Sequence, residues 1–233
     1  MPLDRRSAYV PDLIPESDLA MYRKAGFGHR IGFGQKLGML VVDMTRAFVE
    51  DRFALGSAKM GQVALGAIRE LLTVAREIGL PIFYTRMVPF KTRAEGGRWL
   101  DAAPGIFGSA EDPQAEEGSQ IPLEIAPRPH EPVIVKAKPS AFFGTQLHSM
   151  LTFHRVDTLI VTGMVTSGCV RATVDDAFAY NYRVIIPVEA VADRAEVPHQ
   201  VNLFDMDMIS ADVMPLHAIL AYLRELDRAL YAR

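Results

Sequence analysis

Short runs of apolar residues alternate along this chain with longer segments whose apolar positions recur at helical spacing. Residues 37–43 (LGMLVVD) form a short apolar run with β-branched residues, which is typical of a strand buried on both faces. In residues 59–78 the apolar positions follow a helical period, and Gly79 stands where such a helix would end. The same pattern predicts further strands over 82–85, 133–136, 158–163 and 183–188, and further helices over 16–24, 146–153, 169–180 and 199–206 and after Pro215.

This alternation predicts an α/β fold. Apolar strands separated by helices form a mostly parallel sheet covered on both sides, and right-handed connections then produce a three-layer α/β/α sandwich. We divide the chain into an N-terminal arm, residues 1–30, and a single domain, residues 31–233. Residues 87–130 are rich in Pro, Gly and charge, which predicts irregular structure with a short helix near Trp99. Ligands of such sheets bind at the carboxyl ends of the strands, so candidate site residues are sought there.

Composition narrows the classes of partner. The 233 residues are 49% hydrophobic, enough to fill a sizeable core, and 25 Lys and Arg against 28 Asp and Glu leave a net charge of -3. That balance disfavours a nucleic-acid partner. The N-terminal MPLDRRSAYV lacks the apolar stretch of a signal peptide, and no apolar run is long enough to span a bilayer. One cysteine excludes an intrachain disulfide, so we expect a soluble cytoplasmic protein that does not contact membranes.

Two ionisable residues stand at the ends of predicted strands. Asp43 closes the first apolar run, and burying a carboxylate there without partners would be costly. Its structural alternative is an N-cap for the segment that follows. Lys136 closes the run over 133–136, and its structural alternative is a lysine whose stem packs while its ammonium reaches water. Lys138 is two residues further on and ranks below Lys136 as a site residue.

Cys169 lies where a strand turns through small residues into a helix. In the first helical turn, the macrodipole and free N–H groups would stabilise a thiolate, and the same N–H groups could hold an oxyanion. The alternative is a small buried thiol that packs under the sheet. The strand–turn–helix context favours a nucleophile.

These residues lie within three motifs that together resemble the isochorismatase-like cysteine hydrolases, a superfamily with a Rossmann-like fold. The motifs are LVVDMTRAF (40–48), VIVKAKPSAFFGTQL (133–147) and VTGMVTSGCVRATVDDAFAYNYRVIIPVEAVADR (161–194). The resemblance implies a catalytic triad of Asp43, Lys136 and Cys169. It also implies a cis peptide bond between Met164 and Val165, and an oxyanion hole made of the Val165 and Cys169 N–H groups.

The resemblance also bears on metals and substrate. Nicotinamidases of this superfamily bind a metal through an Asp-x-His pair after the first strand, where this chain has EDRF (50–53), so we expect neither a metal nor another cofactor. True isochorismatases lack the cysteine, which favours amide hydrolysis here. The chain is most similar to the N-carbamoylsarcosine amidohydrolases, through MYRKAGFGHRIGFG (21–34), PSAFFGT (139–145) and ADR (192–194). The resemblance makes Arg194 the clamp for a substrate carboxylate, unless it pairs with a nearby acid such as Asp193. Thr166 and Phe142 are further substrate-binding candidates, and Phe142 could instead fill the core.

The sequence thus predicts a cysteine-dependent amidohydrolase that releases ammonia from a small carboxylate-bearing amide or ureido compound such as N-carbamoylsarcosine. A maleamate amidohydrolase with the same triad is an alternative, because pockets that differ by an atom or two look alike in their motifs. A non-catalytic binding protein on the same fold is another. The family commonly forms homotetramers, so we expect a homo-oligomer, with the N-terminal arm packing on a neighbouring subunit or on its own domain.

Overall fold

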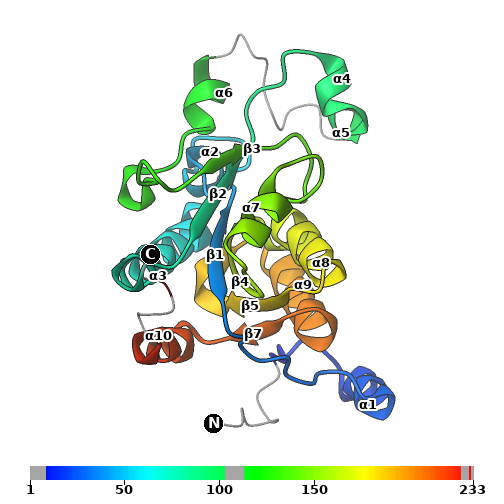
Figure 1. The fold of residues 1–233 in the computed structure, drawn as a ribbon. Helices are drawn as coiled ribbons and strands as arrows, with labels where there is room; N and C mark the ends of the chain where they lie inside the picture. Colours follow the sequence, from blue (N-terminus) through cyan, green and yellow to red (C-terminus); the bar gives the residue numbers. More distant parts are fainter. Residues whose placement is uncertain (1–8, 103–112, 227–230, 232–233) are drawn as a thin grey trace.

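The computed structural model describes residues 9–102, 113–226 and 231. Its centre is a seven-stranded sheet in the order β3-β2-β1-β4-β5-β7, with the short β6 paired to β4, and each of these pairings is parallel (Figure 1). This arrangement confirms the predicted α/β class and the parallel sheet. The strands are β1 (Leu37–Val42), β2 (Ile82–Arg86), β3 (Val133–Val135), β4 (Thr158–Met164), β5 (Arg183–Pro187), β6 (Val191–Ala192) and β7 (Asp212–Met214).

The central strand β1 is buried along its whole length and has a core on each face. Leu37, Met39 and Val41 belong to one hydrophobic cluster, whereas Leu40 and Val42 belong to the other. Successive side chains of a strand point to opposite faces, so a continuous apolar run is needed where both faces are covered.

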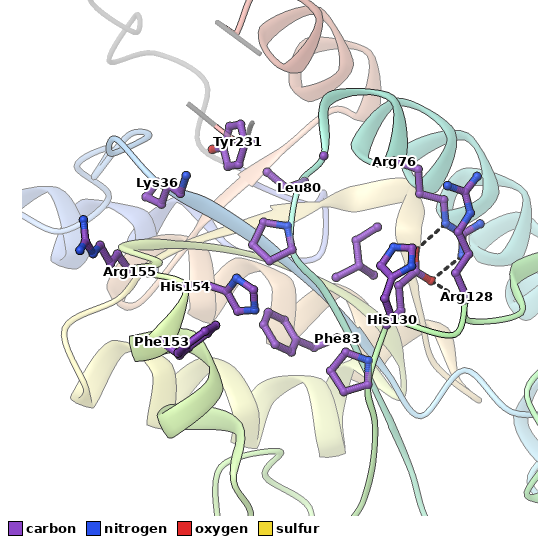
Figure 2. A pocket seen from close by; sticks show the side chains of 15 residues that line it. Lys36, Arg76, Leu80, Phe83, Arg128, His130, Phe153, His154, Arg155 and Tyr231 are labelled. Atoms are coloured by element: carbon purple, nitrogen blue, oxygen red, sulfur yellow. Dashed lines mark hydrogen bonds and ion pairs between the residues drawn. The ribbon is translucent and has the colours of Figure 1, made fainter. Parts of the chain in front are cut away.

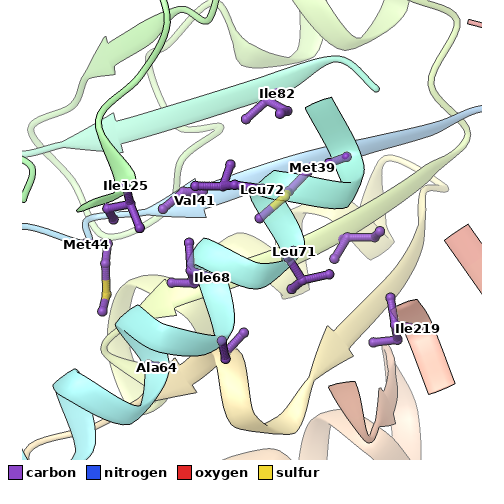
Figure 3. Packing of buried hydrophobic residues seen from close by; sticks show 14 of the residues in the cluster. Met39, Val41, Met44, Ala64, Ile68, Leu71, Leu72, Ile82, Ile125 and Ile219 are labelled. Carbon is purple, nitrogen blue, oxygen red and sulfur yellow. The ribbon is translucent and has the colours of Figure 1, made fainter. Parts of the chain in front are cut away.

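Helices α3 (Ala58–Ile78) and α10 (Leu216–Glu225) cover the first face. Ile68 of α3 lies one helical turn before Leu71 and Leu72, and these side chains pack towards Met39 and Val41 of β1 (Figure 3). The helix ends at Gly79, whose φ of 76° is left-handed and whose N–H bonds back to Ala75 O, as the sequence predicts.

Helices α7 (Leu147–Phe153), α8 (Arg171–Ala179) and α9 (Glu196–Ile209) cover the second face, which completes the three layers (Figure 1). The N-terminal helix α1 (Glu16–Ala25) packs on α9 of the same chain. Leu19 lies in a small cluster with Phe204 and Met208, and Arg30 forms an ion pair with buried Asp207. The arm thus packs on its own domain, and packing on a neighbouring subunit stays a prediction.

Several short elements were not predicted. Strands β6 and β7 have two and three residues, too few to show a period of their own. Within 87–130, the predicted helix near Trp99 is present as α5 (Arg98–Ala102). This helix lies beyond the carboxyl ends of the strands (Figure 1), next to the expected site. The unpredicted short helices are α2 (Arg46–Val49), α4 (Arg93–Gly96), α6 (Pro113–Gly118) and η1 (Leu123–Ile125).

Candidate active site

Asp43 follows β1 directly and is fully buried. Its backbone has a φ of 45°, in the left-handed region that Asp tolerates better than most residues. Thr85, on the neighbouring strand β2, holds it there. The Asp43 N–H bonds to Thr85 O and Oγ1, both at 3.1 Å, and the Thr85 hydroxyl donates to Asp43 Oδ1 at 2.7 Å. One carboxylate oxygen is thus occupied, and Oδ2 is left for the site.

Lys136 follows β3 and supplies the charge that faces Oδ2. Its Nζ lies 2.6 Å from Asp43 Oδ2, and neither side chain is exposed at all. The ammonium also donates to Lys138 O at 3.0 Å and to Pro139 O at 2.9 Å. Burial by itself would lower the pKa of Lys136, but its interactions with Asp43 and Cys169, above all with the Asp43 carboxylate, outweigh burial and raise the pKa. The lysine is therefore held as a cation.

Cys169 completes the group, although its setting differs from the prediction. It lies in a single π-helical turn, η2 (Thr166–Val170), between β4 and α8, rather than in the first turn of an α-helix. Inside this turn the Val170 N–H reaches back to Val165 O at 3.2 Å. The peptide bond between Met164 and Val165 is cis, as the family resemblance implied. Such π turns occur often at functional sites.

The protonation of Cys169 also differs from the prediction of a stabilised thiolate. The side chain is only 4% exposed, and burial together with the Asp43 charge raises the pKa of the thiol, against the opposing effect of Lys136. These effects favour the neutral thiol over the thiolate. Sequence position alone could not show this, because it depends on how deeply the turn is buried.

The sheet order explains why residues so far apart in sequence meet. The strands that carry them lie in the sequence β3, β2, β1, β4, and all are parallel, so their carboxyl ends share one edge. At this edge Val42 is paired with Gly163, whose φ is 110° and where a Cβ would lie 1.9 Å from Val42 O. Only glycine permits this approach of β4 to β1, which brings the turn carrying Cys169 next to Asp43.

A buried carboxylate that the sequence did not single out as a site residue stabilises the turn around Cys169. Asp193 Oδ2 accepts the Ser167 N–H at 2.6 Å, and its Oδ1 accepts the Arg194 N–H at 2.8 Å. Thr166 is fully buried and its hydroxyl lies 2.8 Å from His199 Nδ1, whose pKa is lowered by burial. Thr166 therefore supports the turn that carries Cys169. A role towards substrate stays a prediction.

Thr173, one helical turn after Cys169, is a second residue that stabilises this turn and that the sequence did not single out. Its hydroxyl donates to Cys169 O at 2.6 Å and accepts the Ala141 N–H at 2.9 Å, so it ties the loop after Lys136 to the turn that carries Cys169. Thr85, Asp193 and Thr173 share one sequence signal, a small polar residue inside or just beyond an apolar motif. That signal is weak without the fold, because such residues also cap helices.

The candidate substrate residues are less closely defined. The Arg194 side chain is 55% exposed, and its Nη1 lies 3.9 Å from Asp193 Oδ1, a loose pair that leaves the guanidinium open to solvent. Phe142 is buried and packs against Tyr180 and Tyr182, with ring centroids 5.4 Å and 5.9 Å away. Its core role is thus visible, whereas a role towards substrate stays a prediction. Lys138 donates to Glu95 O and Gly96 O of α4 instead of facing Asp43.

Among the described residues, no three His, Cys, Asp or Glu side chains gather as a metal would require. None of the helices described is both long and apolar enough to cross a membrane.

Comparison with known proteins identifies the class. A family model described as "Isochorismatase domain" matches residues 38–217. The chain belongs to the isochorismatase family, and its three-layer fold is that of isochorismatase-like hydrolases. This confirms the family and the hydrolase class that the motifs indicated.

Individual relatives narrow the comparison. The N-carbamoylsarcosine amidase of Arthrobacter sp. is 34% identical over 226 residues, covering 95% of this chain and 84% of the relative. The maleamate amidohydrolase of Pseudomonas putida is 33% identical over 204 residues, covering 86% and 92%. Among solved structures, the N-carbamoylsarcosine amidase from Thermoplasma acidophilum superposes with a TM-score of 0.65 at 27% identity, covering 78% of this chain and 96% of that one.

Proposed function

We propose that this protein is a cysteine-dependent amidohydrolase that releases ammonia from a small carboxylate-bearing amide or ureido compound, N-carbamoylsarcosine being the first candidate. The observation that carries the proposal is the buried Asp43–Lys136 pair beside the Cys169 thiol, at the edge of the sheet where ligands bind. A carboxylate and an ammonium are costly to bury even as a pair, and together with the neighbouring thiol they are the groups that amide hydrolysis needs.

The acylation step follows from the protonation states. Asp43 Oδ2 takes the proton from the Cys169 thiol as the sulfur attacks the carbonyl carbon, and the carbonyl electrons move to oxygen. Lys136 remains a cation and stabilises the charges of the carboxylate and the sulfur. Backbone N–H groups of Val165 and Cys169 would hold the developing oxyanion.

The tetrahedral intermediate then collapses. Asp43 returns its proton to the leaving nitrogen, the C–N bond breaks, and ammonia departs from a thioester-type acyl-enzyme. Water, deprotonated by Asp43, attacks the acyl carbon, and the sulfur leaves and recovers the proton. One carboxyl group thus serves as base and acid in turn.

Substrate choice rests on Arg194 and on the relatives. The half-exposed guanidinium of Arg194 offers a bidentate fork for a carboxylate. The relatives named for N-carbamoylsarcosine and for maleamate differ by one percentage point in identity, 34% against 33%, so maleamate is a second candidate. Both names denote amides that carry a carboxylate.

Ammonia release from N-carbamoylsarcosine, N-carbamoylglycine, maleamate, nicotinamide and biuret tests the function. We expect turnover only of the carboxylate-bearing amides, loss of nearly all turnover in Cys169→Ser, and a raised KM in Arg194→Gln. Removing a charged hydrogen-bond donor should raise KM about tenfold or more. An active Cys169→Ser variant would refute the nucleophile, and a silent panel with an unreactive Cys169 would favour the non-catalytic alternative.

We further propose a homo-oligomer, by resemblance a tetramer, in a reducing compartment such as the cytoplasm. The edge strand β3 and η1 leave large apolar side chains in solvent, with Val135 52% and Leu123 89% exposed. Light scattering after gel filtration would give the mass directly. A monomer at working concentrations would contradict the proposal.

A further inference from the structure

We propose that a hollow at the amino ends of β1, β2 and β3 binds a small molecule with two anionic groups on either side of a flat apolar centre. The hollow has a volume of about 730 Å³ (Figure 2), within the size range of small-molecule sites. Lys36, Pro81 and Pro132 line it, and each is the residue just before one of these strands.

This position separates it from the site described above. In a parallel sheet the amino and carboxyl ends of the strands form opposite edges. Asp43 and Lys136 follow the carboxyl ends of β1 and β3, whereas the hollow lies at their amino ends. A molecule bound there would not touch the reacting atoms.

The charge of the lining is opposite in sign to that of the chain, whose net charge is -3. Four cationic side chains face the hollow, with Glu131 as the one carboxylate among the lining residues. Glu131 already binds Arg76, through two hydrogen bonds of 2.8 Å and 2.7 Å. The other three cations are Lys36, Arg128 and Arg155.

Two of these cations are available to a ligand. In the described part of the chain, the exposed guanidinium groups of Arg128 and Arg155 have no ion-pair partner. Arg76 is different, because it also donates to Tyr84 Oη and Ala126 O and is held in place. Arg128 therefore lies beside the Arg76–Glu131 ion pair, which is held in place and whose two charges offset each other.

The arrangement of the lining defines the ligand class. In Figure 2, Lys36 and Arg155 lie on one side, Arg128 with His130 on the other, and Phe83 between them. Phe83 packs edge-on to His154, with ring centroids 5.8 Å apart, and together with Leu80, Pro81 and Pro132 it makes the middle of the lining apolar. Guanidinium groups at both ends fit a carboxylate or phosphate at each end.

Calorimetric titration of the full-length protein with benzene-1,4-dicarboxylate tests this. We expect one site per chain, with binding weakened about tenfold or more in Arg128→Gln and in Arg155→Gln, because each loses a charge-assisted contact. Arg155→Lys, which keeps the charge but loses the bidentate fork, should bind more weakly than the wild type and more tightly than Arg155→Gln. Arg69→Gln, an exposed arginine of α3 outside the hollow, and Arg194→Gln at the proposed active site should bind like the wild type.

Four results would overturn the proposal. These are absence of binding, loss of binding in Arg194→Gln, an equal loss in Arg69→Gln, or a change of oligomeric mass in Arg128→Gln, which would mark the hollow as an interface between copies. The neutral diamide of the same ring should fail to bind. If pyrophosphate bound as tightly as benzene-1,4-dicarboxylate, the ligand would not need an apolar centre, and that part of the proposal would be wrong.

Discussion

The buried Asp43–Lys136 pair dominates the energetics at the scale of single residues. Both side chains are removed from water, and their mutual attraction, two carbonyls and the Thr85 hydroxyl offset the loss of hydration. The pair is weak evidence of a role in stability, because an apolar pair of similar volume would be about as stable.

Removing one partner should therefore be worse than removing both charges. We expect Lys136→Met to lower the free energy of unfolding by about 3–5 kcal/mol, because the Asp43 carboxylate is left buried and unneutralised. The double variant Asp43→Asn/Lys136→Met should recover much of that loss in urea unfolding while remaining inactive. A single variant as stable as the wild type would contradict the buried ion pair.

The Cys169 thiol gives a second test at this scale. Because burial and Asp43 raise its pKa, only a small thiolate fraction exists near neutrality. The rate of alkylation by iodoacetamide in the absence of substrate should rise about tenfold per pH unit between about pH 7 and about pH 9, since the thiolate fraction rises in that proportion below the pKa. A plateau near neutral pH would indicate a preformed thiolate instead.

At the scale of elements, the short helix α4 is tied to the strand end that carries Lys136. Lys138 Nζ donates to Glu95 O at 3.1 Å and to Gly96 O at 3.0 Å, the last carbonyls of α4. A cation at a helix C-terminus satisfies carbonyls that have no partner within the helix. Lys138 lies two residues after Lys136, so the loop that carries Lys136 also positions α4.

Lys138→Met should loosen this segment without unfolding the protein. We expect faster amide hydrogen exchange in α4 and α5, with the global free energy of unfolding changed by less than about 1 kcal/mol, because local opening costs less than global unfolding. Lys91→Met, a nearby exposed lysine, is the matched control and should leave exchange unchanged. Unaltered exchange in Lys138→Met would show that α4 is held by other contacts.

At the scale of the whole molecule, the Arg76–Glu131 pair joins α3 to the loop that precedes β3. Burial would raise the pKa of Glu131, but the bonds from Arg76 and from the Arg128 N–H outweigh it, so the pKa falls below its ordinary 4.5. The folded protein then binds this proton less readily than the unfolded chain. The stabilisation is present above the unfolded pKa and is lost as pH falls through the folded one.

Acid should reveal this contribution. In urea unfolding at pH 7 and at about pH 3.5, we expect the wild type to lose more stability than Glu131→Gln, which cannot titrate. Glu70→Gln, which changes an exposed glutamate of α3, should lose as much stability in acid as the wild type does. If Glu131→Gln and the wild type have the same pH dependence, the pair does not contribute it.

The bounds of long elements could be predicted from the sequence, whereas the shortest elements could not. The long, periodic helix α3 and the apolar strands β1 and β4 were predicted within a residue or so, because period and composition are local properties. The two-residue β6, the three-residue β7 and the π turn at Cys169 were not. Their conformations depend on pairing with distant segments, so no local pattern encodes them.

The sequence by itself determined the order of strands and helices and placed Asp43, Lys136 and Cys169 at strand ends, since these depend on neighbours along the chain. Only the tertiary structure decided that Asp43 and Lys136 form an ion pair of 2.6 Å, and that the thiol lies buried where the pKa of Cys169 is raised. It also created the cationic hollow at the far edge of the sheet. Distances and burial between remote segments follow from sheet order and packing, which no local pattern contains.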